Sequence, residues 1–307
     1  MTVYSGRSEQ LVGPLVEQFR SATGITVNVR YADTAELAIL LIEEGANSPA
    51  DVFFAQDAGA LGAVAQENML AELPAGLLGT VPEAFRSPAG QWVGISGRAR
   101  VIAYDTAELG EADLPQSIDE LTGEEWRGRI GWAPTNGSFQ SFVTALRQLR
   151  GEDGARAWLA AMLANDPVRY EGNSPIVQAI ADGEVDLGLV NHYYALRQRA
   201  EQGDEFPVDN HFLPANDPGA LVNVAGAGLL ATSRNEAAAL RFLEYLLAAD
   251  AQRYFAEQTF EYPLVAGVEQ PSGTPALADI GHPDIDLSDL ADLEGSLALL
   301  NEVGVLP

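Results

Sequence analysis

Short strand-like segments alternate with longer helical patterns at the start of this chain. Residues 9–23 and 35–44 have the apolar spacing of helices, and each pattern ends at a glycine. Residues 25–31 and 51–54 have the composition of strands that follow these helices or lie between them. Because parallel strands need helical crossovers, this alternation predicts an open α/β sheet. Ligands of such sheets bind at the carboxyl ends of the strands.

The length of 307 residues exceeds what one hydrophobic core ordinarily holds together, and it predicts two domains. The strand-like stretch 92–104 could pass from the first domain into the second, and the apolar, glycine-rich stretch 222–230 could carry the chain back. Between them, a strand at 128–132 followed by a helix at 138–149 indicates that the second domain also alternates strands with helices. We therefore expect an α/β protein with two domains joined by crossing strands.

The composition argues against several kinds of partner. The net charge is −27, from 44 acidic and 17 basic residues, whereas nucleic acids and anionic membranes bind positively charged surfaces. The chain has no cysteine, which excludes disulfides and thiolate chemistry. No apolar run approaches the roughly 18 residues that span a bilayer, and the first residues do not have the pattern of a secretory signal. We expect a chain that neither inserts in a membrane nor binds nucleic acid.

Two adjacent tyrosines, Tyr193 and Tyr194, follow an apolar segment at 185–190 that has the pattern of a buried strand. Successive side chains of an extended segment point to opposite faces, so at least one of the two rings is expected to be displayed. A phenolate is a hard oxygen donor that suits a hard cation such as ferric iron. On spacing alone, such a pair more often serves packing and hydrogen bonding, because tyrosine buries its apolar ring and leaves its hydroxyl in contact with water.

Segments in the same order along the chain resemble the bacterial ferric-ion-binding proteins, the soluble receptors of iron ABC transporters. These segments are residues 3–7, 49–54, 96–101, 136–138, 172–174, 191–194 and 217–223. The resemblance implies a two-lobed, type II periplasmic-binding-protein fold with a ligand cleft between the lobes. The N-terminal lobe would hold residues 1–98 and 223–270, and the C-terminal lobe residues 99–222 and 271–307. It also implies a monomer exported to the periplasm, without its signal or lipid anchor here, that delivers its cargo to an ABC permease.

The resemblance assigns the ferric ion to Tyr193 and Tyr194, with a synergistic anion such as carbonate, phosphate or citrate completing the coordination. The anion would be bound at a predicted helix start and by two amides, and the residues are Asn136, Gly137, Ser138, Asn173 and Asn191. A helix N-terminus offers unpaired N–H groups to an anion, although an ordinary cap and turn explains the first three equally well.

Three arginines are candidates for binding the anion or for holding the tyrosines ionised. Arg98 and Arg100 project to one side of an extended segment that matches the family, and either could face the site. Arg7, in the first loop, is less favoured because surface arginines are common.

The N-terminal lobe departs from the family pattern. Many relatives have a histidine, or a histidine followed by a tyrosine, where this chain has Ser8 and Glu9, and a glutamate where it has Gln56. Glu9 could substitute as a carboxylate ligand, and Asp57 could reach in beside Gln56, but each is more often an acid at a helix start. Ser8, Gln56 and Asp57 are therefore expected behind the ligands, and the N-terminal lobe should supply few donors.

Three histidines are expected to serve other roles. His192 precedes the tyrosines and should point away from Tyr193 if the segment is extended, so we expect it behind the ligands or at the surface. His211 and His282 have no metal-ligand spacing and are expected to be structural.

Two functions remain for such a receptor. The first is capture of ferric iron with an anion and delivery to a permease. The alternative keeps the fold but binds an oxyanion such as a phosphonate or phosphate without metal, with the tyrosines as neutral donors. An enzyme is not expected, because the sequence has no Gly-x-Ser-x-Gly elbow, no Walker loop and no histidine-carboxylate hydrolase motif.

Overall fold

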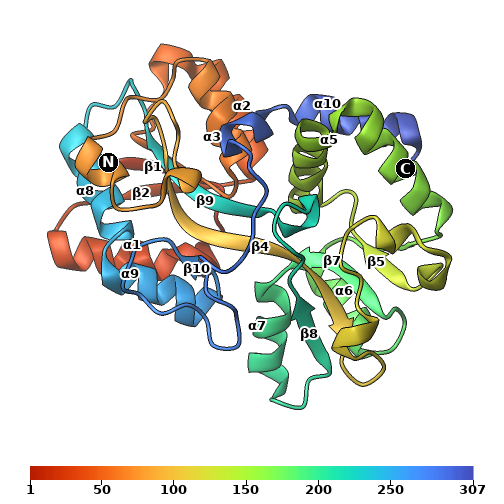
Figure 1. The fold of residues 1–307 in the computed structure, drawn as a ribbon. Coiled ribbons are helices and arrows are strands. Elements are labelled where there is room, and N and C mark those ends of the chain that lie inside the picture. The colour runs from red at the N-terminus through yellow and green to blue at the C-terminus, as the bar shows by residue number, and fades with distance from the viewer. Residues whose placement is uncertain (307) are drawn as a thin grey trace. The chain divides into compact units, whose positions relative to one another are not determined.

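The alternation predicted for the first residues is present in the structure, a computed structural model that describes residues 1–306 (Figure 1). Its first elements are β1 (Thr2–Ser5), α1 (Glu9–Thr23), β2 (Asn28–Tyr31), α2 (Thr34–Glu44) and β3 (Val52–Ala55). β1 pairs in parallel with β2 on one side and with β3 on the other. The helix predicted at 9–23 is confirmed at both ends, because Gly24 adopts the left-handed conformation that ends α1 (φ 71°).

The chain divides into two units, each assembled from separate stretches. Unit 1 holds Met1–Gly97, Asn223–Thr274 and Asp286–Ala291, and unit 2 holds Arg98–Val222, Pro275–Ile285 and the residues from Asp292 onward. The sequence division placed all of 271–307 in the second lobe, whereas unit 1 includes residues 271–274 and the segment 286–291. This segment contains the 3-10 helix η8 (Leu287–Ala291), which packs on α3 (Ala58–Gln66) where Gly59 and Gly62 have no side chain to keep its backbone away.

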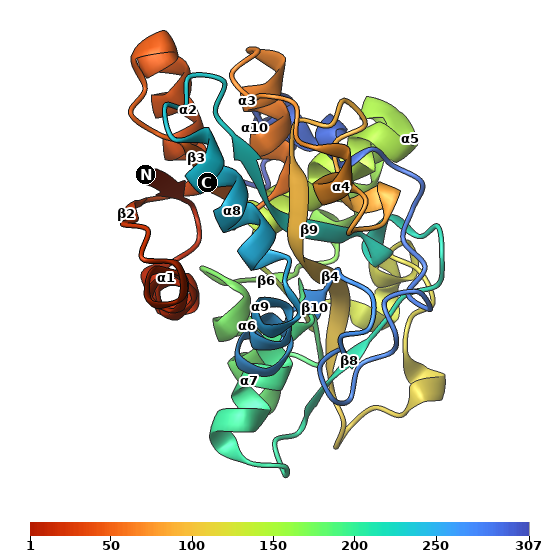
Figure 2. The same ribbon diagram turned by 90° about the vertical axis from the view of Figure 1, so that its left-hand side faces the viewer.

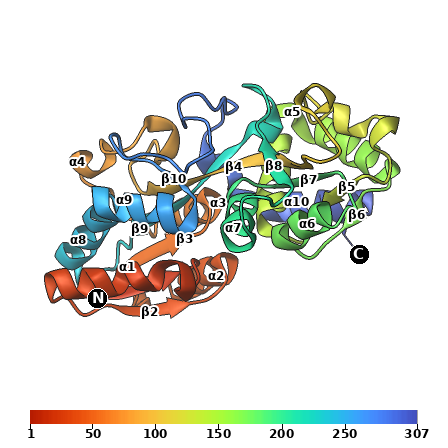
Figure 3. The same cartoon turned by 90° about the horizontal axis from the view of Figure 1, so that it is seen from below.

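Unit 1 is a mixed sheet covered by helices. Its sheet order is β2-β1-β3-β9-β4, and β2 lies at the edge (Figure 3). The elements that complete unit 1 are α4 (Ala75–Leu78), the first part of β4 (Val93–Asp105), β9 (Val222–Leu229), α8 (Glu236–Leu246), α9 (Ala249–Tyr254) and β10 (Tyr262–Pro263). Figure 2 shows α1 nearly along its axis with α8 beside it. Phe19 of α1 joins the two helices through edge contacts with Phe242 and Tyr245.

Unit 2 is built around β7, which pairs antiparallel with β4 and parallel with β5. Its elements are the second part of β4, β5 (Ile130–Trp132), α5 (Gly137–Ala164), β6 (Val168–Arg169), α6 (Asn173–Ala181), β7 (Leu187–Asn191), α7 (Tyr193–Gln202), β8 (Val208–His211) and α10 (Leu293–Val303). The parallel strands β5, β6 and β7 are each followed by a helix. The starts of α5, α6 and α7 therefore lie at one edge of the sheet.

Two strands carry the chain between the units, as the sequence predicted. β4 passes from unit 1 to unit 2 between Gly97 and Arg98, and β9 returns between Val222 and Asn223. Within residues 1–306, none of the helices combines the length and the apolar character needed to cross a bilayer.

Candidate functional site

Hydrogen bonds tie the starts of α5 and α6 to the end of β7 in unit 2. The side-chain oxygen of Asn136, the residue that caps α5, accepts from the Ser138 N–H (3.0 Å), the Ser138 hydroxyl (2.6 Å) and the Asn173 amide (3.2 Å). Asn173, the first residue of α6, in turn accepts from the backbone N–H of Asn191 (3.0 Å). Asn173 and Asn191 are both buried. The structure thus brings together the residues predicted to hold an anion.

Tyr193 and Tyr194 open α7, immediately after β7. The expectation that they lie on an extended segment is wrong, because the chain turns into a helix at His192 (φ −54°, ψ −38°). The two rings stack, with centroids 4.3 Å apart and an interplanar angle of 28°. Tyr193 is buried and Tyr194 is half-buried. Both phenols thus lie side by side in the first turn of a helix, where the macrodipole favours negative charge.

His192 fixes this turn against β4. Its backbone N–H donates to the Ala99 carbonyl (2.9 Å), and its ring Nδ1 accepts from the Ala99 N–H (3.2 Å). The ring is fully buried and makes an edge contact with Tyr193, so it lies behind the tyrosines and not at the surface. His211 and His282 are each hydrogen-bonded to a proline carbonyl.

Arg98 and Arg100 are both buried on β4, on either side of Ala99. Arg100 donates to the Ser138 carbonyl (3.1 Å), and its guanidinium lies over the rings of Phe139 and Phe142 (5.9 and 5.1 Å to the centroids). Arg98 lies close enough for its charge to act on Tyr194. Arg100 thus contacts the start of α5, and the charge of Arg98 acts on Tyr194.

The protonation of Tyr194 is dominated by its surroundings. Burial raises its pKa far above the ordinary value of 10, and the neighbouring Tyr193 raises it further. The charges of Arg98 and Arg197 act in the opposite direction without reversing the shift. Tyr194 is therefore a neutral phenol at neutral pH, and only a strong cation at its oxygen would ionise it.

The candidate residues of unit 1 are engaged in contacts of their own. Arg7 is buried and forms an ion pair with the buried Glu261 (2.5 Å), and Ser96 donates to the other Glu261 oxygen (2.6 Å). Asp57 caps α3 by accepting from the Ala60 N–H (3.0 Å). Gln56 donates its backbone N–H to the Thr34 hydroxyl (3.0 Å).

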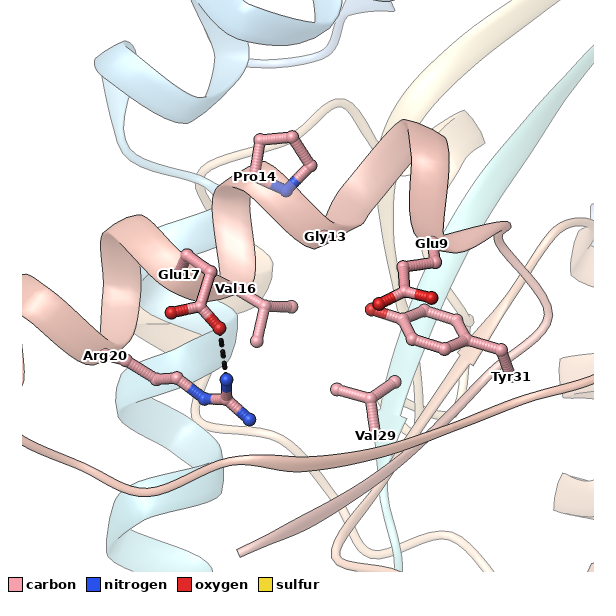
Figure 4. A pocket seen from close by; sticks show the side chains of 8 residues that line it. All are labelled: Glu9, Gly13, Pro14, Val16, Glu17, Arg20, Val29 and Tyr31. Atoms are coloured by element: carbon pink, nitrogen blue, oxygen red, sulfur yellow. Dashed lines mark hydrogen bonds and ion pairs between the residues drawn. The ribbon is translucent and has the colours of Figure 1, made fainter.

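Ser8 and Glu9 begin α1, and Glu9 lines a cavity of about 320 Å³ between α1 and β2. Figure 4 shows the Glu9 carboxylate beside the hydroxyl of Tyr31, at the end of β2. Burial raises the pKa of Tyr31, and the charge of Glu9 raises it further. Sequence reasoning missed this pairing, because nothing in the pattern of residues 25–31 shows which side of β2 faces α1.

A second residue that the sequence did not single out is Arg197. Once α7 begins at Tyr193, Arg197 lies three residues after Tyr194 and therefore on the same face of the helix. A pattern that places the tyrosines on an extended segment cannot reveal this neighbour.

The candidate metal ligands of this site are phenol oxygens and not a cluster of acidic side chains. Within residues 1–306, no group of three or more His, Asp or Glu side chains is arranged to hold a metal ion. Tyr193 and Tyr194 are the adjacent pair of hard donors that the site offers.

Known proteins match this chain over almost its whole length. The family model of the bacterial extracellular solute-binding proteins matches residues 47–281. The Fe(3+)-binding periplasmic protein of Serratia marcescens is 33% identical over 308 residues, covering 100% of this chain and 90% of the relative. Iron-bound HitA from Pseudomonas aeruginosa superposes with a TM-score of 0.91 at 33% identity, with 99% of each chain covered.

A Trichodesmium structure named IdiA or FutA, in complex with iron and citrate, has a TM-score of 0.86 at 31% identity, again over 99% of each chain. These similarities confirm the predicted α/β fold class of the two-lobed periplasmic binding proteins. The chain belongs to the family of bacterial extracellular solute-binding proteins, among its periplasmic ferric-ion-binding members.

Proposed function

We propose that this protein captures ferric iron through the phenolate oxygens of Tyr193 and Tyr194, together with an exogenous anion bound at the starts of α5 and α6. The observation that carries the proposal is the stacked pair of phenols in the first turn of α7. Two neighbouring hard oxygens suit a trivalent cation, which can ionise them at neutral pH. The relatives named as ferric-binding proteins support the same reading.

The anion subsite is supported by the donors that converge on Asn136. Three donors share its single side-chain oxygen, so an anion oxygen could receive some of them instead. Arg100 adds a buried positive charge beneath Ser138, and it has no carboxylate partner within residues 1–306. Phosphate, carbonate and carboxylates all carry the oxygen and the charge that this subsite would take.

An oxyanion receptor without metal is the second candidate, and the same donors favour it. It does not explain why two phenols lie together beside the anion subsite, since neutral hydrogen-bond donors need no such pairing. Delivery to an ABC permease, a location outside the cytoplasmic membrane, a monomeric state and the absence of catalysis follow from the family and are part of the proposal.

The test is the visible absorption of the protein with ferric iron, because charge transfer from tyrosinate to iron is coloured and an anion-only site is not. We expect Tyr193→Phe and Tyr194→Phe to lose most of this band and to bind ferric iron at least roughly tenfold more weakly, about 1.4 kcal/mol. The matched control is Tyr170→Phe, which removes a phenol in unit 2 that donates to Glu184. The ferric site is elsewhere if both single variants keep the colour and affinity of the unmodified protein.

A further inference from the structure

A second cavity opens in unit 2 beside Tyr194. It has a volume of about 230 Å³ and lies between α6 and α7, where Tyr194, Arg197, Ser174 and Glu201 are among its lining residues. Since one water molecule occupies about 30 Å³ of liquid, the cavity can hold the arm of an organic molecule and not only a single ion. The cavity shares Tyr194 with the candidate ferric site.

Arg197 gives this cavity a positive charge that is not held in an ion pair in the described part of the chain. Neither an ion pair nor a hydrogen bond engages its side chain within residues 1–306, whereas Arg199 on the same helix pairs with Asp209 and donates to the Val208 carbonyl. Glu201 also lines the cavity, four residues further along α7, and it forms no ion pair with Arg197 among the residues that the structure describes. The cavity is therefore lined by one basic and one acidic side chain, and the basic residue is the nearer of the two to Tyr194 along α7.

The wall of the cavity is held in place by side-chain amides. Gln198 donates to the Ser174 carbonyl (3.0 Å), and Gln202 donates to both Gln198 (3.1 Å) and Gln178 (3.2 Å). These bonds join α6 to α7, so the wall is fixed before any ligand arrives. A polar wall with an arginine outside any ion pair is suited to a carboxylate, because the guanidinium fork matches the two carboxylate oxygens.

We propose that this cavity is a separate subsite for the free carboxylate of a hydroxypolycarboxylate chelator, such as citrate, that enters together with the ferric ion. The proposal rests on the proposed function, and it makes Arg197 the residue that selects an organic chelator over a compact inorganic anion. Phosphate or carbonate at the start of α5 would bridge to the metal without reaching Arg197. A polycarboxylate would bind the metal with some of its oxygens and place a remaining carboxylate against Arg197.

The experiment compares ferric affinity with citrate and with phosphate as the supplied anion. We expect Arg197→Gln to weaken binding roughly tenfold or more with citrate, the loss typical of one charged hydrogen-bonded pair, and less than about threefold with phosphate. Arg197→Lys should recover part of the loss, because it restores the charge without the fork. Glu201→Gln is the comparison of opposite sign, and it should tighten citrate binding because it removes the negative charge that lines the same cavity.

The subsite is disproved if Arg197→Gln weakens binding equally with both anions, which would mean that the arginine acts only through its field on Tyr194. It is also disproved if the variant binds ferric citrate as the unmodified protein does. Failure of the proposed function looks different, because the unmodified protein would then show no tyrosinate band with either anion.

Discussion

Arg100 carries a buried positive charge that no acidic side chain pairs with inside the described part of the chain. It is 3% exposed, and it contacts two aromatic rings. Burial lowers its pKa to about 10, so it stays protonated at neutral pH. A buried charge without a counterion is costly. An anion at the start of α5 would supply that counterion, which links the stability of the site to anion binding.

We expect Arg100→Met to separate the cost of burying the charge from the stabilisation that a bound anion provides. Methionine fills much of the same volume without the charge, so the unfolding free energy of the anion-free protein should stay within about 1 kcal/mol of its original value or rise. Phosphate at 100 times its dissociation constant should stabilise the unmodified protein by about 2.7 kcal/mol, and the variant at the same concentration by much less. Denaturant titrations with and without phosphate measure both. Undiminished stabilisation by phosphate in the variant would remove Arg100 from the anion subsite.

Asp57 illustrates how an acid at a helix start can be mistaken for a ligand. Its side chain already accepts from the Ala60 N–H as the cap of α3. Asp57→Ala should therefore lower the unfolding free energy by about 1 kcal/mol and leave ferric affinity unchanged whichever anion is supplied. Glu9→Ala, which removes the acid beside Tyr31, is the comparison for unit 1. Abolished ferric binding in either variant would identify that acid as a primary ligand.

At the scale of elements, α5 joins the anion subsite to the core of unit 2. Its first turn carries Ser138, and Phe142 and Trp158 pack edge to face further along (centroids 5.5 Å apart). Between them Gly151 leaves the helical conformation (φ 72°, ψ 169°), so α5 is kinked at this residue. That combination of angles is open essentially only to glycine.

We expect Gly151→Ala to destabilise the protein by about 1–3 kcal/mol, because a side chain strains this backbone. The opposite sign is expected if residue 151 were helical, since alanine in a helix interior is favoured over glycine by roughly 0.5–1 kcal/mol. Equilibrium denaturation decides between the two. Ferric binding by the folded variant should be little changed, because the first turn of α5 lies more than three helical turns away.

Local sequence patterns predicted the bounds of helices and strands more accurately than the contacts between them. The apolar spacing of residues 9–23 and the glycine that follows predicted both ends of α1, while the strand expected at 25–31 is shortened to Asn28–Tyr31. The cap signal of Asn136 predicted the start of α5 to within one residue. In contrast, α7 was not predicted, because its first residues turn into a helix through hydrogen bonds to Ala99, far away in the sequence.

The same limit explains which site residues were found. Tyr193 was named from its place after a buried strand, and Asn136 and Asn173 from a family resemblance. The hydrogen bond between the two asparagines depends on the pairing of β5 with β6 and β7. Arg197 was missed because the tyrosines were expected on an extended segment and not at the start of a helix. Tyr31 was missed because its neighbour Glu9 comes from the packing of α1 on β2. The segment 286–291 was assigned to the wrong lobe for the same reason, since its contacts with α3 are long-range.

For the whole molecule, lowering the pH affects ligand binding and folding stability through different titratable side chains. Asp51 lies near the joint between β3 and the end of β9, in unit 1. Burial alone would raise its pKa, but hydrogen bonds from Ser233, the Thr2 N–H and Asn235 outweigh burial and hold the pKa below its usual value of 3.8. A carboxyl group whose pKa is lowered on folding stabilises the protein at pH values above its unfolded-state pKa. This stabilisation is lost as the pH falls through the lower, folded-state pKa. Protonation of Asp51 therefore destabilises unit 1 only in strong acid.

Release of iron should begin at higher pH. Tyr194 is protonated in the metal-free protein because its pKa is raised, so its ligation to iron releases a proton. The apparent logarithm of the ferric association constant should then fall by about one for each unit that the pH is lowered, and by more if a second phenol ionises. We expect the tyrosinate band of the ferric protein to fade between about pH 7 and pH 5, while the far-ultraviolet circular dichroism stays constant until the carboxylates titrate near pH 4. Tyr194→Phe is the control, since it removes this proton and should flatten the dependence of whatever binding remains. A band that keeps its full intensity until the circular dichroism changes would show that protons do not compete with the metal, and tyrosinate ligation would then be wrong.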